Sequence, residues 1–564
     1  MASAVPSGMA SGDPSVASRR MPGSLTHTTS TSLRAWQRLA LDRLAAWQDG
    51  PFLISAAPGA GKTRPALEFA RDLLARRSTK RIVVLCPTTP LTRQWAAAAA
   101  SLGVQLQPDA PSAEPPRDFN GVAVTYARVA SDPGLWARTV SSDTLVVVDE
   151  AHHLGEELAW GVGFRTAFAP ARRWLLLSGT PFRSDATPIP GVRYDSEGVV
   201  VPDVSYTYAQ AVAEGICRPV AFVTFDGSLS WRSGEDVIES SFETVLTGRE
   251  ASRRYRTAIS TELPDGLPRI LEEADAKLRA LREGGHGDAG ALAVAADATH
   301  ARQIAKLLAE VTGKTPLVVL HTEAQAARKL ADFRGSREPW IVAVNMVSEG
   351  VDIPRLRVGV YATAAKTPLI FRQIVGRFVR TTPGTSAEAS WLYLPADQTL
   401  RGHAAEVESE LRHVLRREEP DEEWDEPVER RTSEPSPTAD FVPLSAEFEA
   451  QMTLFGAPQP VVTRSPTLPA PAAAGPAATE SGPGSEPPPV AAFERREELR
   501  RERSRLVGEL HRRDGLSHRE INSWLNRTVG LARVDDATIP QLERSVRALV
   551  KELTRRPRSR ATAG

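Results

Sequence analysis

The amino-acid sequence predicts an α/β protein with two consecutive parallel-sheet domains. Short apolar runs alternate with helical patterns from about residue 32 to 400, and they fall into two series of five. The runs are continuous in Val, Leu and Ile, which is typical of strands buried on both faces in a parallel sheet covered by helices. The expected strands are 52–56, 81–85, 121–125, 144–148 and 173–177 in the first series, and 291–295, 316–320, 340–344, 357–361 and 390–394 in the second.

The composition is that of a chain with a large core. Of the 564 residues 41% are hydrophobic and 24% are charged, and 69 basic residues balance 69 acidic ones. This neutral total does not exclude nucleic acid as a partner, because charge can be segregated along a chain. Cys86 and Cys217 are too few for a four-cysteine zinc site or a disulfide framework. With no disulfide framework, we expect a reducing, cytoplasmic location. No run approaches the roughly 18 apolar residues of a membrane span, so we expect no membrane partner.

Composition also suggests where the segments begin and end. Residues 418–490 hold 15 Pro, 14 acidic and 3 basic residues, which predicts a flexible acidic linker that cannot bury enough apolar surface to fold. Residues 493–564 hold 18 basic against 11 acidic residues. The expected segments are a disordered N-terminal tail (1–31), a first α/β domain (32–221), a connecting region (222–285), a second α/β domain (286–417), the linker (418–490) and a small all-α, basic C-terminal module (493–556).

The first strand leads into a loop with the pattern of a phosphate-binding site. Glycines in such a loop let backbone N–H groups turn towards phosphate oxygens, and the helix that follows adds partial positive charge. Lys62 would pair with the β- and γ-phosphates, and the Thr63 hydroxyl would hold Mg²⁺. The loop consists of Pro58, Gly59, Ala60, Gly61, Lys62 and Thr63.

The fourth strand ends in two adjacent carboxylates, Asp149 and Glu150. The carboxyl end of a parallel strand borders the crevice in which such sheets bind ligands. Asp149 therefore suits Mg²⁺ coordination, and Glu150 suits polarising an attacking water molecule. Together with the loop, the pair predicts hydrolysis of a nucleoside triphosphate.

With these motifs, the chain resembles a superfamily 2 helicase with a DEAH-type box over roughly residues 32–400. The resemblance implies two tandem RecA-like domains and ATP as the nucleotide. Ala56 replaces the first Gly of the strict loop pattern, as is usual in helicases, and Gly179 stands where the family commonly has Ala. Further first-domain residues receive implied roles: Arg34 and Gln37 in adenine recognition, Thr88, Gln94 and Thr125 on the nucleic-acid backbone, and His152, Ser178 and Thr180 in coupling the two domains.

The second series of strands carries two more stretches that resemble helicase motifs. Gly350 and Asp352 lie in the first stretch and are implied to contact the nucleotide. The second stretch, QIVGRFVR, places Gln373, Arg377 and Arg380 among the implied catalytic residues. The two arginines are three residues apart, so on a helix they would share a face. Guanidinium groups delivered from a second domain can stabilise charge on a transferring phosphoryl group.

These observations predict an ATP-dependent helicase or translocase that acts on DNA. The stretches SGTPFRSD and EGVDIP resemble those of DNA-repair and transcription-associated translocases related to XPB and RadD. Two alternatives stay open at this point. The substrate could be RNA, since the superfamily serves both nucleic acids, or the chain could be a nucleotide-gated clamp or adaptor in a repair or defence complex that does not unwind.

The linker and the tail each allow two interpretations. Gln451, Leu454 and Phe455 resemble the bacterial sliding-clamp-binding pentapeptide, and the alternative is a short helix that docks on this protein's own core. The tail predicts helices over 493–513, 517–527 and 539–555. These helices would form either a helix-turn-helix-like DNA-binding module or a small bundle used for docking or dimerisation.

Overall fold

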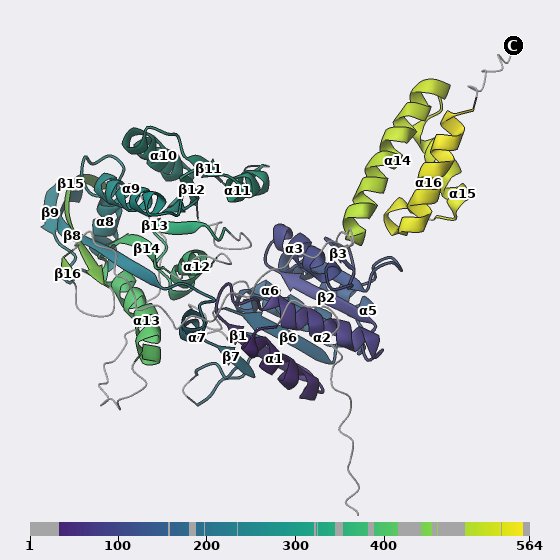
Figure 1. Ribbon diagram of the computed structural model, residues 1–564, viewed down its shortest axis with the longest axis horizontal. Coiled ribbons are helices and arrows are strands. Elements are labelled where there is room, and N and C mark those ends of the chain that lie inside the picture. The colour runs from purple at the N-terminus through teal and green to yellow at the C-terminus, as the bar shows by residue number, and fades with distance from the viewer. Residues whose placement is uncertain are drawn as a thin grey trace, which may run out of the picture.

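The computed structural model describes residues 33–155, 158–179, 188–196, 198–233, 235–320, 323, 325–344, 353–381, 388–415, 441–453, 459–460, 491–531 and 533–555. The described strands form two sheets. Figure 1 shows these sheets flanked by helices, and a separate group of helices near the C-terminus. Within these ranges no helix is long and apolar enough to cross a membrane.

The first sheet is parallel throughout, in the order β3-β4-β2-β5-β6-β1-β7. Its strands are β1 (Gly50–Ala56), β2 (Arg81–Cys86), β3 (Leu106–Pro108), β4 (Gly121–Thr125), β5 (Thr144–Asp149), β6 (Arg173–Ser178) and β7 (Val204–Tyr206). Its helices are α1 (Ala35–Ala46), α2 (Thr63–Ala75), α3 (Thr89–Ala100), α4 (Tyr126–Ser131), α5 (Pro133–Thr139), α6 (Leu158–Phe168) and α7 (Tyr208–Ala213), with a 3-10 helix at Ala151–Gly155. The five strands predicted for the first domain are confirmed.

Both faces of the first sheet are covered, which explains its continuous apolar runs. Side chains of neighbouring residues in a strand point to opposite faces. On β2, Ile82 and Val84 pack in the cluster that includes residues of α1, α2 and α3. Val83 and Leu85 pack in a second cluster with residues of α4, α5 and α6. All strands run the same way, so their carboxyl ends gather at one edge.

The second sheet is parallel over six strands, in the order β11-β12-β10-β13-β14-β8, and continues into antiparallel β15 and β16, with β9 also paired to β8. Its strands are β8 (Val220–Ser233), β9 (Asp236–Ser240), β10 (Gly290–Ala295), β11 (Leu317–Val319), β12 (Trp340–Val344), β13 (Leu356–Ala362), β14 (Ser390–Pro395), β15 (Phe441–Thr453) and β16 (Gln459–Pro460). Its helices are α8 (Gly248–Ala258), α9 (Leu267–Glu283), α10 (Ala298–Thr312), α11 (Ala326–Gly335), α12 (Pro368–Phe378) and α13 (Gln398–Leu415). The five predicted strands are confirmed here too.

The structure corrects the prediction that 222–285 is a connecting region. The segment is part of the second domain, because its strands β8 and β9 join the second sheet, where β8 runs parallel to β14 from Val220 to Phe225, and its helices are α8 and α9. The first half of β8 is buried. Antiparallel β15 pairs with β8 from Phe222 to Ser233, and antiparallel β9 pairs with its last residues, from Leu229 to Ser233. The strand was weak in the sequence because its second half alternates with polar residues and its parallel partner follows about 170 residues later.

The structure also corrects the prediction of an uninterrupted flexible linker over 418–490. Residues 441–453 form β15, which pairs with β8 along its length, and Ala446 and Phe448 are buried. The alternative prediction was a short helix that docks on this protein's own core. The segment does dock on the core, but as a strand and not as a helix. Gln451 pairs with Thr224 in the sheet, while Leu454 and Phe455 lie outside the described residues. A segment paired into a sheet is not a free peptide, so the sliding-clamp prediction has no support.

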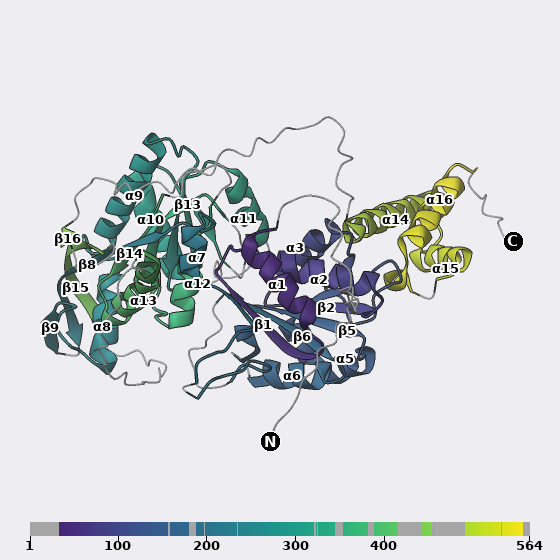
Figure 2. The same cartoon turned by 60° about the horizontal axis from the view of Figure 1, so that its bottom comes forward.

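The three predicted C-terminal helices are confirmed as α14 (Ala492–Asp514), α15 (His518–Val529) and α16 (Ile539–Leu553). We call them the C-terminal module. They share a hydrophobic core of their own that includes Leu506, Leu525 and Leu549. Figures 1 and 2 both place the module beside the first sheet and away from the second. It contacts the first domain near β3, where Gln105 Oε1 accepts a hydrogen bond from the Ala492 amide at 3.0 Å.

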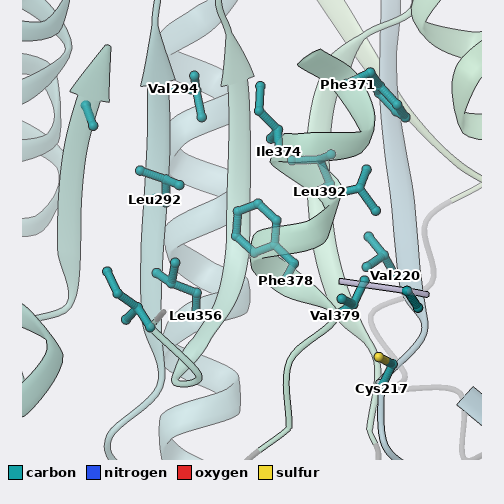
Figure 3. Close-up of a cluster of buried hydrophobic side chains, with 14 of the residues drawn as sticks. Cys217, Val220, Leu292, Val294, Leu356, Phe371, Ile374, Phe378, Val379 and Leu392 are labelled. Carbon is teal, nitrogen blue, oxygen red and sulfur yellow. The ribbon is translucent and has the colours of Figure 1, made fainter. Parts of the chain in front are cut away.

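Helix α12 is fixed on the second sheet by apolar side chains. Figure 3 shows Phe371, Ile374 and Phe378 of this helix lying over β13 and β14. Gly359 of β13 leaves the room for this packing, because a Cβ there would overlap the Phe378 ring. The helix that carries Gln373 and Arg377 is therefore held rigidly by its apolar face.

Candidate functional site: a phosphate-binding loop at the domain interface

The predicted phosphate-binding loop connects β1 to α2 with the backbone that its glycines allow. Gly59 and Gly61 have φ angles of +78° and +88°, a region that side-chain-bearing residues rarely adopt. Thr63 opens α2, so the loop ends at a helix N-terminus whose first amides are free of helical partners. The cradle is thus built from backbone N–H groups and a helix end, which fits a phosphate group.

Helix α1 holds the loop through two side chains singled out in the sequence. Arg34 Nη1 donates to the Ala60 carbonyl at 2.6 Å, and Gln37 Nε2 donates to the Gly61 carbonyl at 3.0 Å. A Cβ at Gly61 would stand only 2.9 Å from Gln37 Nε2, so the second glycine of the loop is needed for this close approach. The two side chains thus lie on the loop itself.

The carboxylate pair lies at the carboxyl end of β5, as the sequence predicts. Glu150 has a φ of +52°, a left-handed conformation that costs about 1–2 kcal/mol for a residue with a Cβ. Its Oε1 accepts a hydrogen bond from Lys62 Nζ at 3.1 Å, and its Oε2 accepts one from the Gly179 amide at 3.4 Å. The strained backbone therefore aims Glu150 at the loop and away from the sheet.

The two carboxylates have opposite electrostatic environments. Burial, reinforced by the charge of Glu150, raises the pKa of Asp149 to about 6. Burial acts in the same direction on Glu150, but Lys62 and the neighbouring His152 outweigh it and lower the pKa of Glu150 to about 2. Glu150 is therefore ionised at neutral pH. Asp149 Oδ2 also accepts a hydrogen bond from Trp95 Nε1 at 2.7 Å.

The donor atoms present suit Mg²⁺. This ion prefers hard oxygen ligands, keeps several waters and takes few protein ligands. The Thr63 hydroxyl and the Asp149 carboxylate offer such oxygens beside the phosphate cradle. The residues predicted to hold the ion are chemically consistent with it.

The second domain meets the loop through the end of α12. A Cβ at Gly376 would stand 3.1 Å from Pro58, and a Cβ at Gly59 would stand 3.2 Å from Cγ of Arg380. Arg377 is buried beside these contacts, at 8% exposure. The loop and the predicted arginines, more than three hundred residues apart in sequence, therefore lie together.

One prediction about the arginines is wrong. Helix α12 ends at Phe378, so Arg377 and Arg380 do not share a helix face. Arg380 lies in an extended segment and forms an isolated antiparallel bridge with Cys217. The extended backbone after the helix turns Arg380 towards Gly59.

A chain of polar side chains links Glu150 to the second domain through His152. Ring atom Nδ1 of His152 lies 3.2 Å from Ser178 Oγ and 3.6 Å from Glu150 Oε2. Its Nε2 lies 3.4 Å from Gln373 Nε2. The predicted coupling residues His152 and Ser178 and the predicted catalytic residue Gln373 are thus brought together, while Thr180, Gly350 and Asp352 lie outside the described residues.

Sequence reasoning missed the contacts of the segment at residues 216–218, which joins the two domains. The Arg218 amide donates to the Val379 carbonyl at 2.7 Å, and Thr381 Oγ1 donates to the Ile216 carbonyl at 2.9 Å. Cys217 Sγ contacts the Pro58 carbonyl at 3.3 Å. The chain between the sheets therefore touches both the loop and the segment that bears Arg380. No motif marked it, since these contacts are mostly made by backbone atoms.

The predicted nucleic-acid residues lie on the same edge of the first sheet. Thr88 is the N-cap residue of α3, Gln94 is exposed on that helix, and Thr125 caps α4 by accepting from the Arg128 amide. Trp95 and Tyr126, each next to one of these residues, belong to the same helicase-like stretches of the sequence but received no predicted role of their own. Both are buried, and a buried aromatic residue on a helix gives the same sequence signal as any core residue.

Comparisons with known proteins place this geometry in a family. The family described as "Type III restriction enzyme, res subunit" matches residues 30–183, and "Helicase conserved C-terminal domain" matches residues 285–382. Rv2917 of Mycobacterium tuberculosis is 41% identical over 443 residues, which are 76% of this chain and 73% of that protein. ML1624 of Mycobacterium leprae is 42% identical over 399 residues, which are 68% of this chain and 65% of that protein.

Among solved structures, a fragment of a putative HsdR subunit of a type I restriction enzyme from Vibrio vulnificus is similar with a TM-score of 0.47 and 17% identity, over 66% of this chain and 65% of that one. The two family matches cover the stretches of the chain that carry the phosphate-binding loop and the predicted arginines Arg377 and Arg380. Their presence implies a nucleic-acid-dependent ATPase. The chain belongs to the superfamily 2 helicases, in one family with Rv2917.

Proposed function

We propose that this protein is an ATP-dependent DNA helicase or translocase that takes part in DNA repair in the cytoplasm. The observation that carries the proposal is the contact between the phosphate-binding loop and the second domain. Pro58 meets Gly376, and Gly59 meets Arg380, so a nucleotide on the loop would be touched by both domains. A nucleotide that bridges two domains can close them when it binds and release them after hydrolysis.

In this proposal the loop residues bind the triphosphate and Arg34 and Gln37 lie near the nucleotide on the α1 side. When the triphosphate binds, Lys62 Nζ would leave Glu150 and contact phosphate oxygens instead. The Glu150 carboxylate would then be available to accept a proton from the attacking water. Thr63 and Asp149 would hold Mg²⁺, which, when bound, neutralises charge on the phosphate oxygens. Arg377 and Arg380 stabilise the charge that develops on the transferred phosphoryl group. Gly350 and Asp352 are proposed to contact the nucleotide from the second domain.

We further propose that Thr88, Gln94 and Thr125 contact the sugar-phosphate backbone of the strand. Such contacts position a strand without reading its sequence. Binding should therefore be tolerant of sequence and should weaken as salt concentration rises. DNA as the substrate is supported by the resemblance of the SGTPFRSD and EGVDIP stretches to DNA translocases.

Parallel ATPase assays with single-stranded DNA, duplex DNA and RNA test the nucleic acid. We expect hydrolysis to be stimulated most by DNA, and Glu150→Gln to bind ATP without turnover. Strong stimulation by RNA alone would replace DNA with RNA as the substrate. Turnover that survives in E150Q would refute the role of Glu150.

Strand displacement on 3′-tailed, 5′-tailed and blunt duplexes tests movement. We expect ATP-dependent displacement or translocation on at least one substrate. ATP-dependent binding to DNA without displacement or translocation on any of them would instead favour the nucleotide-gated clamp.

A further inference from the structure

We propose that Trp95 is a positioning residue that orients the carboxylate of Asp149 and links it to α3, the helix through which the nucleic-acid strand would be contacted. The proposal rests on the proposed function. It makes one buried indole the direct physical connection between the strand-binding edge and the Mg²⁺-binding carboxylate.

The contact between the two residues is short and buried. Trp95 Nε1 donates to Asp149 Oδ2 at 2.7 Å, with Trp95 2% and Asp149 8% exposed. A hydrogen bond to a carboxylate is stronger than one between neutral groups, and more so away from water. The bond from the indole engages Oδ2, and the Glu150 amide also donates a hydrogen bond to this carboxyl. The indole, held in the core by its helix, therefore restrains the rotation of the carboxylate.

Helix α3 carries the candidate strand contacts on its other face. Thr88 caps the start of this helix, and Arg93 and Gln94, just before Trp95, are exposed. The opposite face is packed into the core through Thr92, Trp95 and Ala96. Packed interiors transmit displacement because they have little free volume. A shift of α3 on a strand would therefore move the indole and, through it, Oδ2 of Asp149.

Tyr126 makes a second connection to the same residue. Its hydroxyl donates to the backbone carbonyl of Asp149 at 2.6 Å, and it directly follows Thr125, another candidate strand contact. The two segments proposed to touch nucleic acid thus each donate one hydrogen bond to Asp149. Trp95 acts on the carboxylate and Tyr126 acts on the backbone, which allows the two effects to be separated.

The competing explanation is that Asp149 only provides a hydrogen-bond acceptor for the buried indole N–H of Trp95, and that the indole does not orient the carboxylate. The two explanations differ in what Trp95→Phe does to Mg²⁺. Loss of a group that orients a metal ligand commonly weakens metal affinity by about 10–100-fold. We expect W95F to need at least about tenfold more Mg²⁺ for half-maximal binding of a fluorescent ADP analogue, measured without nucleic acid. We also expect a smaller stimulation of its ATPase by single-stranded DNA, with DNA binding retained.

Two variants serve as controls. Trp174→Phe removes another indole of the same domain, whose Nε1 donates to the Phe168 carbonyl at 3.2 Å, and should leave the Mg²⁺ requirement unchanged. Tyr126→Phe removes a buried donor from the backbone oxygen of Asp149 and should change the Mg²⁺ requirement much less than W95F. Equal shifts in W95F and W174F would overturn the proposal.

Stability is separated from positioning with a second substitution. Trp95→Leu loses the same donor as W95F but should be less stable, because it fills less of the space left by the indole. The proposal requires similar Mg²⁺ shifts in the two variants despite different unfolding temperatures; shifts that follow stability, or a wild-type Mg²⁺ requirement in the folded W95F, would overturn it. If no nucleic acid stimulates the wild-type ATPase, the proposed function fails, whereas the Mg²⁺ titration still decides the role of Trp95.

Discussion

Gly376 of α12 lies directly against Pro58 of the phosphate-binding loop, so close that a Cβ at Gly376 would stand 3.1 Å from both Cβ and Cγ of the proline ring. This contact joins the two sheets at the proposed site of hydrolysis. It also places Arg377, the next residue, beside the loop. Because Gly376 has no Cβ, the two domains can approach closely at this point.

Replacing Gly376 should move Arg377 away from the phosphate-binding loop. In Gly376→Ala the added methyl group must push α12 or Pro58 away by a few tenths of an ångström, which shifts Arg377. Misplacement of about 1 Å near a reacting group can cost on the order of a hundredfold in rate. We therefore expect the kcat of the nucleic-acid-stimulated ATPase to fall about ten- to a hundredfold, while nucleotide binding falls less.

Gly402→Ala is the matched control for that variant. Gly402 lies in α13 of the same domain, and a Cβ there meets nothing within 4 Å. Ala is preferred over Gly inside a helix by about 1 kcal/mol, so this variant should be slightly more stable and fully active. A normal rate in G376A would show that the contact with Pro58 does not position Arg377.

The raised pKa of Asp149 predicts a pH-dependent affinity for Mg²⁺. The pKa of this buried carboxyl is about 6, and only its ionised form can hold the cation. We expect the Mg²⁺ concentration needed for nucleotide binding to rise as pH falls through 6. Titrations of Mg²⁺ at several values between pH 5 and pH 8 measure this, and a flat profile would contradict it.

The same group predicts the sign of a stability effect without Mg²⁺. Because the folded state raises the pKa above the ordinary carboxyl value of 3.8, the native state binds more protons than the unfolded state between the two values. The contribution to stability is complete below pH 3.8 and is lost as pH rises through 6. The free energy of unfolding of Asp149→Asn, measured against pH without Mg²⁺, should lack this dependence. The prediction is contradicted if the wild type, compared with this variant, loses stability as the pH falls from 6 to 3.8.

Strand β15 should be a stabilising part of the second domain. Phe448 is 1% exposed and its ring lies 6.2 Å from that of Phe225. Truncation of a buried Phe to Ala costs about 3–5 kcal/mol. Phe448→Ala should lower the free energy of unfolding of the second domain by this amount in urea titrations. Val442→Ala, at an exposed position of the same strand, should be nearly neutral; similar losses in both variants would argue against a specific role of Phe448.

Docking of the C-terminal module should depend weakly on its surface ion pair. Arg93 Nη2 and Glu497 Oε1 are 3.1 Å apart, and both side chains are about half exposed. Exposed pairs contribute roughly 0–1 kcal/mol, so Glu497→Arg should loosen the module only slightly. The charge swap R93E/E497R should restore docking, as read by small-angle scattering and limited proteolysis.

The second anchor of the module gives the contrasting variant. Asp118 Oδ2 accepts a hydrogen bond from the Ile539 amide at the start of α16, at 2.5 Å. Asp118→Ala combined with E497R should release the module more than either change alone. A double variant that stays as compact as the wild type would mean that Ala492 and the apolar contacts suffice for docking.

Much of the fold and site follows from local sequence. All ten predicted strands are present, because strands buried on both faces must be continuously apolar. The loop around Lys62 and the position of Asp149 and Glu150 at the end of a strand were also predicted, since phosphate binding and strand ends impose their residues locally. The left-handed backbone of Glu150 was not predicted. Strands β8 and β15 were not predicted as parts of one sheet. Alternation of polar and apolar residues predicts a strand only weakly in these two segments. The two strands are also about 200 residues apart, so nothing in the local sequence indicates that they pair.

By itself, the sequence determined the two parallel sheets, the loop at residues 58–63 and the carboxylates beside it, because apolar runs, glycines and adjacent acids act over a few residues. Only the tertiary structure decided that Gly376 meets Pro58, that Arg380 leaves its helix to reach Gly59, and that Trp95 binds Asp149. Those contacts join residues far apart in the chain, and their geometry depends on how whole helices pack on their sheets.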